Sequence, residues 1–190
     1  MATLASIGYG LGKYLTDADQ DTVGADLSVI NNGLLQFKIA DSKNYAFYTI
    51  VNGSVDAYTD ETGIDTSTST NETYDATNDL YSPTGGNTNM TLVSNAFTAA
   101  AQSGFARFVF FEEDVDACTL NTDIKAYVSR DNGSTFTQVT LADKGNYASG
   151  KRVLAGSVDI SGQPAGTAMK YKIETLNNKN LKIHGANLNW

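Results

Sequence analysis

Four acidic side chains stand close together near the middle of the chain. Glu112, Glu113, Asp114 and Asp116 all lie within the stretch FFEEDVD. Two carboxyl groups at a suitable separation can hydrolyse a glycosidic bond, and several together can hold a cation. However, acidic residues directly after a strand usually form a solvated loop, and we expect that arrangement here.

Histidine and cysteine are scarce, which limits nucleophilic catalysis and zinc binding. His184 is the only histidine and lies in the alternating stretch LKIHG, where a structural role is expected. Cys118 is the only cysteine, so the chain cannot form a disulfide within itself. We expect Cys118 to be a small buried or half-buried residue.

The acidic stretch DADQD near the start resembles the opening of a calcium loop. Asp17, Asp19 and Asp21 stand at alternate positions. An EF-hand then needs glycine at its sixth position and glutamate at its twelfth, where this chain has Thr22 and Ser28. We therefore predict no metal site, no cofactor site and no catalytic residue.

The stretch SRDNGSTF, residues 129–136, has the spacing of the Asp-box that recurs in sialidase-like propellers. A propeller needs such a motif in each of several four-stranded blades, and it occurs here once. Turn chemistry explains its positions, because Asp131 can accept backbone N–H groups and Asn132-Gly133 tolerates positive φ. We predict a hairpin turn rather than an active site, with Phe136 returning to the core.

The elements that would position these residues are strands. Residues alternate in hydrophobicity, or form short apolar runs bounded by turn residues, in nine segments. The predicted strands cover 33–40, 45–53, 54–60, 104–113, 123–130, 135–142, 151–160, 168–176 and 180–190. Residues 91–101 are interpreted as a strand that leads into a short helical turn. Because no crossover helices separate the strands, we predict an all-β fold, an antiparallel β-sandwich of jelly-roll type.

Two segments fall outside this pattern. Residues 1–30 lack a clear period and contain Gly8, Gly10 and Gly12, so we predict an N-terminal arm. Residues 31–190 form the predicted sandwich domain. Within it, residues 59–90 are polar and rich in turn formers, which predicts one long surface loop. We expect four apolar residues to anchor this loop: Ile64, Tyr74, Leu80 and Tyr81.

Charge narrows the choice of partners. The net charge is −8, whereas phosphate binding needs clustered lysine and arginine, so we expect no nucleic-acid partner. Residues 1–120 carry a net −12 and residues 121–190 a net +4. Opposite charges at the two ends can steer docking between subunits, although acidic solvated loops explain them as well. We find no signal peptide and no apolar run of the length a membrane span needs.

The C-terminal part of the chain resembles a segment of tailed-bacteriophage structural proteins, especially those of marine and cyanobacterial phages. The matching stretches are SRDNGSTFTQV, GKRVLAGSVDISGQPAG, MKYKIET and LKIHGANLNW, preceded by a similar stretch that starts at VDAYTDETG. Together they cover roughly residues 50–190. The resemblance implies a β-sandwich module of the virion: a capsid decoration (cement) protein, a fibre or a tail-associated protein. It implies no catalytic residues.

From this resemblance we expect a non-enzymatic virion protein that is made in the host cytoplasm and located on the capsid surface. The small size and the absence of repeats favour a decoration protein, a homotrimer seated on the major capsid protein, over a fibre. The arm and the 59–90 segment are the expected contact elements. The alternative is a tail, fibre or adsorption protein that recognises host glycan through surface tyrosine, tryptophan and asparagine side chains. A role of Trp190 as a core or edge plug is favoured over sugar stacking.

Overall fold

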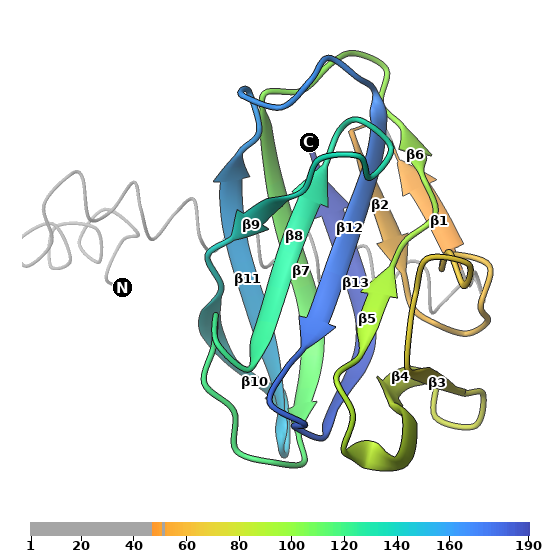
Figure 1. The fold of residues 1–190 in the computed structure, drawn as a ribbon, viewed down its shortest axis with the longest axis vertical. Coiled ribbons are helices and arrows are strands. Elements are labelled where there is room, and N and C mark those ends of the chain that lie inside the picture. Colours follow the sequence, from red (N-terminus) through yellow and green to blue (C-terminus); the bar gives the residue numbers. More distant parts are fainter. Residues whose placement is uncertain (1–46, 51) are drawn as a thin grey trace, which may run out of the picture.

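The chain folds as two antiparallel β-sheets packed face to face (Figure 1). The structure is a computed structural model that describes residues 47–50 and 52–190. The larger sheet contains eight strands: β1 Phe47–Ile50, β2 Gly53–Asp56, β3 Glu72–Asp75, β4 Leu80–Pro83, β7 Phe105–Asp114, β10 Ala142–Ala148, β11 Lys151–Asp159 and β13 Leu181–Asn189. The smaller sheet contains five: β5 Thr91–Val93, β6 Phe97–Thr98, β8 Ile124–Ser129, β9 Thr137–Val139 and β12 Ala168–Thr175. The predicted all-β antiparallel sandwich is therefore confirmed.

The strand order follows from pairs that lie far apart in sequence. The larger sheet runs β1-β2-β13-β7-β11-β10, with the β3–β4 hairpin attached to β13 through β4. The smaller sheet runs β5-β12-β8-β9, and β6 pairs with another part of β12. The C-terminal strand β13 thus lies between β2 and β7, deep in the larger sheet. Strands from both ends of the described chain are therefore neighbours in this sheet.

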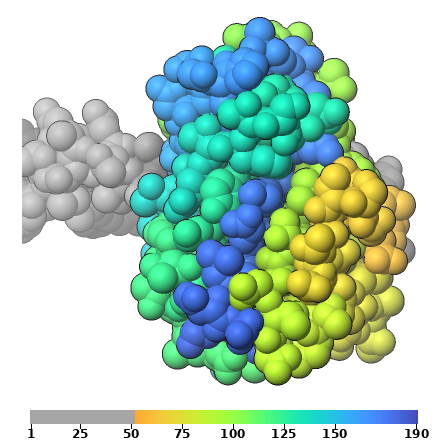
Figure 2. Space-filling model, viewed as in Figure 1, coloured from red at the N-terminus to blue at the C-terminus, as the bar shows by residue number. Residues whose placement is uncertain are grey.

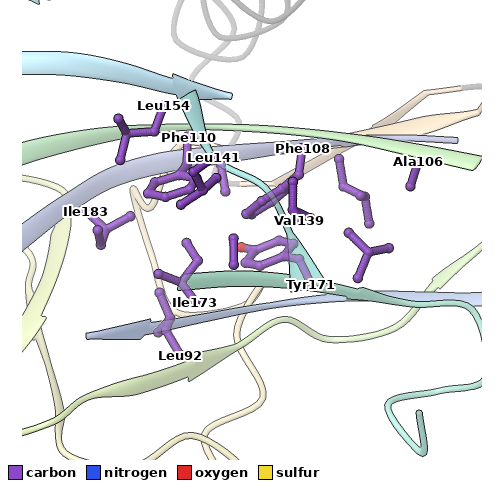
Figure 3. Close-up of a cluster of buried hydrophobic side chains, with 14 of the residues drawn as sticks. Leu92, Ala106, Phe108, Phe110, Val139, Leu141, Leu154, Tyr171, Ile173 and Ile183 are labelled. Atoms are coloured by element: carbon purple, nitrogen blue, oxygen red, sulfur yellow. The ribbon is translucent and has the colours of Figure 1, made fainter. Parts of the chain in front are cut away.

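The main core fills the space between the two sheets (Figure 3). In β12, Met169, Tyr171 and Ile173 point inward, and alternate residues face away from the core, as the period of a strand requires. In β7, Phe108 and Phe110 face the same core. Figure 3 shows these aromatic rings between the sheets, beside Val139 and Leu141. Phe111, which has the other parity, faces away from this core.

A second apolar cluster lies on the opposite face of the larger sheet. It contains Val55, Val109, Phe111, Val153 and Ala155, all buried. Phe111 stacks on Tyr147 of β10 with a centroid distance of 4.3 Å. The larger sheet is therefore apolar on both faces at its centre. This explains why the sequence of β7 contains a continuous run of apolar residues.

The structure corrects two of the predicted elements and leaves two others outside its range. The 59–90 segment is not one long loop, because it contains the β3–β4 hairpin and a short 3₁₀ turn at Thr84–Gly86. Three of its predicted anchors, Ile64, Leu80 and Tyr81, are buried, and Tyr74 is half-buried. Residues 91–101 form β5 and β6 and no helical turn. The predicted arm (1–30) and the predicted strand at 33–40 lie outside the described residues.

Candidate functional site

The turn between β8 and β9 is built by the side chains of the Asp-box. Asp131 Oδ1 accepts hydrogen bonds from Thr135 N at 2.8 Å and from Ser129 Oγ at 2.7 Å. Asn132 and Gly133 have φ of 61° and 84°, the left-handed conformation that these residue types tolerate. Partial burial tends to raise the pKa of Asp131, but the hydrogen bonds from Ser129 and Thr135 act against it, and the pKa is lowered overall. The Asp131 carboxylate therefore stabilises the turn through its hydrogen bonds, as the sequence predicted.

Phe136 does not return to the core, contrary to the prediction. It is half-buried and lies on the outer face of the smaller sheet. The Lys172 ammonium stands 5.0 Å from the centroid of its ring and 4.3 Å from that of Tyr127. Phe136 has the same parity as the exposed Gln138, whereas Val139 is buried, so the period of two along β9 itself turns Phe136 outward.

Together with a second loop, this turn forms a groove over the smaller sheet. The groove encloses about 290 Å³. Asn132, Gly133 and Phe136 line one wall, Thr68 lines the other, and the floor is made by four residues of β5 and β12: Thr91, Val93, Lys170 and Lys172. Figure 2 shows this face, with the blue surface of β12 between the teal 130s segment and the yellow 60s segment.

Charged side chains tie the groove together. Lys170 Nζ donates to Asp65 Oδ2 at 2.9 Å, which joins the floor to the wall that contains Thr68. Lys172 Nζ donates to Glu174 Oε1 at 2.6 Å along the same strand. Hydrogen bonds from Ser67 and then from Lys170 hold the pKa of Asp65 well below its usual range. The Asp65 carboxylate therefore stays ionised at neutral pH.

Three residues of the acidic cluster, Glu112, Glu113 and Asp114, lie at the end of β7 rather than in a solvated loop, which corrects the sequence interpretation. Asp116 follows in an exposed bend, as expected. Glu112 is fully buried, and its Oε2 accepts a 2.6 Å hydrogen bond from Arg152 Nε. Arg152 also lies 3.0 Å from Asp114 and 3.6 Å from Asp143. Burial raises the pKa of Glu112 to about 7, although Arg152 opposes this shift. β11, which pairs with β7, provides the arginine that makes burial of a carboxyl group tolerable.

Glu112, Asp114 and Cys118 offer ligand atoms within 4.8 Å of one another. The Arg152 guanidinium contacts all three, with Nη2 at 3.0 Å from the Cys118 sulfur. Burial and the neighbouring carboxylates raise the pKa of the half-buried Cys118 thiol to about 12, so it stays protonated at neutral pH. The two carboxyl groups and the thiol surround the Arg152 guanidinium, which already supplies the positive charge that a metal ion would bring.

The remaining candidate residues also have structural contacts. His184 Nε2 lies 2.9 Å from Glu113 Oε2, and Lys182 Nζ lies 3.1 Å from Glu113 Oε1. Burial lowers the pKa of His184, against the opposing effect of Glu113. Trp190 packs on Phe97 at the edge of the core, as predicted, with a centroid distance of 6.4 Å. The predicted absence of a calcium loop at Asp17, Asp19 and Asp21 lies outside the described residues.

Comparison with known proteins identifies no family for this chain. No protein-family model matches it, and no curated protein matches it. Among solved structures, it is similar to the C-terminal CBM6 of LamC, a marine laminarinase from Zobellia galactanivorans. That match has 10% identity and a TM-score of 0.36, and it covers 55% of this chain and 75% of the other.

A second similar structure is the CBM22-1 xylan-binding domain of Xyn10C from Paenibacillus barcinonensis. It has 10% identity and a TM-score of 0.31, and the match covers 76% of this chain and 85% of that domain. Both neighbours are carbohydrate-binding modules, and both are too distant to bear on function. Neither is a phage protein, so the phage resemblance stays a prediction.

Among the residues described, no helix has the length and apolar character needed to cross a membrane.

Proposed function

We propose that this chain is a non-enzymatic structural protein of a tailed-phage virion, a decoration protein that binds the major capsid protein and stabilises the shell. One structural observation supports the non-enzymatic part. The groups that could have done chemistry are engaged in contacts that build the fold: Asp131 in its turn, Glu112 with Arg152, and Glu113 with His184. The virion part is supported by the sequence resemblance over roughly residues 50–190.

Binding of purified protein to phage heads that lack it tests this function. We expect the protein to sediment with such heads, to saturate at a fixed ratio to the major capsid protein and to raise the temperature at which the heads open. The free protein is expected to be a trimer in analytical ultracentrifugation. Failure to sediment with the heads of the encoding phage would refute the decoration role.

A second candidate function is recognition of host glycan by a tail or adsorption protein. The observation that favours it is the groove over the smaller sheet, where the partly exposed Phe136 stands beside the polar groups of Asn132, Thr68 and Lys170. An aromatic face with a few fixed polar groups around it is a common form of small-molecule site. A glycan array probed with the whole chain tests this candidate, and an array without hits would remove it.

A further inference from the structure

Lys170 lines the groove, and its ammonium group has hydrogen-bond donors to spare. Its side chain is 10% exposed, and its stem runs under the Asp-box turn, since a Cβ on Gly133 would lie 3.4 Å from Lys170 Cδ. Among the described residues, Nζ has one hydrogen-bond partner, Asp65 Oδ2 at 2.9 Å. An ammonium group carries three N–H donors. Lys170 therefore offers further donors at the base of the groove.

The charge of this face differs from that of the whole protein. Lys125 lies directly opposite Glu174 in the β8–β12 register, on the same face as Lys170 and Lys172. The carboxylates there are Asp65, Glu174 and Asp131, the last of which is turned into its own loop. Cations and anions therefore balance on this face of a chain whose net charge is −8. An anionic group meets less repulsion here than an average surface would give.

Both walls of the groove are formed before any ligand arrives. On one side, Ser67 N and Oγ donate to Asp65 Oδ1, and Ser69 N donates to Asp65 O, which fixes the 65–69 loop. On the other side, the bonds to Asp131 fix the turn that carries Phe136. Little ordering entropy is then lost on binding, so even a small ligand can be held.

The geometry favours a sugar over a peptide. The groove lies on the face of the smaller sheet, and the backbone of its floor strand β12 is paired on both sides, with β5 and with β8. A peptide therefore cannot add to it as an extra strand. A sugar ring can stack its C–H face on Phe136 while its polar substituents reach Asn132, Thr68 and Lys170.

We propose that the groove binds a carboxylate-bearing saccharide, such as a uronic or sialic acid unit, with the carboxylate on Lys170 and the ring on Phe136. This inference rests on the glycan-recognition candidate above and specifies its ligand class. Charge-assisted hydrogen bonds from an ammonium group are stronger than those between neutral groups, so the carboxylate supplies most of the selectivity.

The test is an array of uronate oligomers, sialylated glycans and their neutral counterparts, followed by calorimetry on matched pairs. The hexamers of β-1,4-mannuronate and β-1,4-mannose form one such pair, because they differ at C6 alone. We expect the carboxylated member to bind about tenfold more tightly, the difference that one charge-assisted hydrogen bond supplies. Lys170→Gln should abolish that preference, and Phe136→Ala should weaken both members about tenfold. Thermal melts establish that each variant is folded.

Lys179→Gln provides the matched control, since it removes the same charge from the 177–180 turn, outside the groove lining. It should change neither affinity. Equal binding of carboxylated and neutral glycans would overturn the ligand class but leave glycan recognition standing. Binding of acidic glycans that Phe136→Ala and Lys170→Gln leave unchanged would overturn the site. Binding of no glycan would refute both the inference and the glycan-recognition candidate.

Discussion

Asp56 is a carboxyl group that faces the main core. It lies opposite Ala186 in the β2–β13 register and is 1% exposed. Its Oδ1 accepts the Tyr58 N–H at 2.9 Å, while Oδ2 is a buried atom without a hydrogen-bond partner among the described residues. A Cβ on Gly63 would lie 1.8 Å from that oxygen, so glycine is what lets the chain pass so close. Desolvation raises the pKa of Asp56 to about 7.

This raised pKa predicts that stability falls as the pH rises. Between about pH 4 and pH 7 the folded protein keeps a proton on Asp56 that the unfolded chain has lost, so each increment of pH in that window favours unfolding. Glu112, whose pKa is also raised to about 7, contributes with the same sign. We expect urea denaturation to give a free energy of unfolding a few kcal/mol higher at pH 5 than at pH 8, since each pKa unit is worth about 1.4 kcal/mol.

Asp56→Asn separates the two contributions. The amide cannot ionise, so the variant should be more stable than the wild type at pH 8 by about 2–3 kcal/mol, and the difference should shrink toward pH 5. The residual pH dependence between pH 5 and pH 8 then belongs to Glu112 and to His184, whose lowered pKa acts with the opposite sign. A variant whose stability follows the wild-type curve at every pH would show that Asp56 does not carry a proton in the folded state.

Arg152 keeps the buried Glu112 carboxyl group tolerable. Replacing it by leucine removes the partner of a fully buried acid, and the expected loss is about 3–5 kcal/mol of unfolding free energy, measured by urea denaturation at pH 8. Its neighbour Lys151 is the control: its contact to Glu113 is long, at 3.9 Å, and partly exposed to solvent, so Lys151→Met should cost less than about 1 kcal/mol. Equal losses in both variants would contradict the special role of Arg152.

At the scale of the elements, the β8–β9 turn depends on one carboxylate. Asp131→Ala removes the acceptor of Thr135 N and Ser129 Oγ, and we expect a loss of about 1–2 kcal/mol in thermal or urea unfolding. Asn132→Gly is the matched change next to it. It keeps the positive φ of 61° without a side chain and should alter stability by less than about 0.5 kcal/mol. A larger loss for the glycine variant than for the alanine variant would contradict this account of the turn.

The strands that the sequence predicted best are those with a strong apolar signal. β7, β8, β12 and β13 fall within one or two residues of their predicted ranges, because burial imposes a period of two on their side chains. β10 was missed, since all seven of its residues are at least partly exposed and offer no such period. The β3–β4 hairpin was missed for the same reason, as β3 has no buried residue.

The candidate site was predicted only in part. The Asp-box turn follows from local chemistry within eight residues, and its role as a turn could be predicted. The groove could not, because its second wall comes from the 65–69 loop, about sixty residues earlier in the chain. The pairing of Glu112 with Arg152 could not be predicted for the same reason, since Arg152 lies opposite Glu112 in the β7–β11 pairing. Contacts between distant segments are set by strand order, which no local pattern contains.

For the whole molecule, the two outer faces of the sandwich differ in polarity. The larger sheet buries apolar side chains on both of its faces, whereas the smaller sheet presents charged and polar residues outward around the groove. The charge is divided along the chain, with a net −12 before residue 121 and +4 after it. Such a division can steer the docking of one copy of the chain on another, and salt should weaken that steering.

The copy number of the protein in purified virions tests the proposed function most directly. Quantitative mass spectrometry against the major capsid protein gives the ratio. A decoration protein is predicted to be present in a number comparable to the capsid protein, in a fixed ratio from one preparation to the next. A count of a few copies per particle would contradict decoration and favour the tail or adsorption role. Absence from the particle would refute the virion assignment altogether.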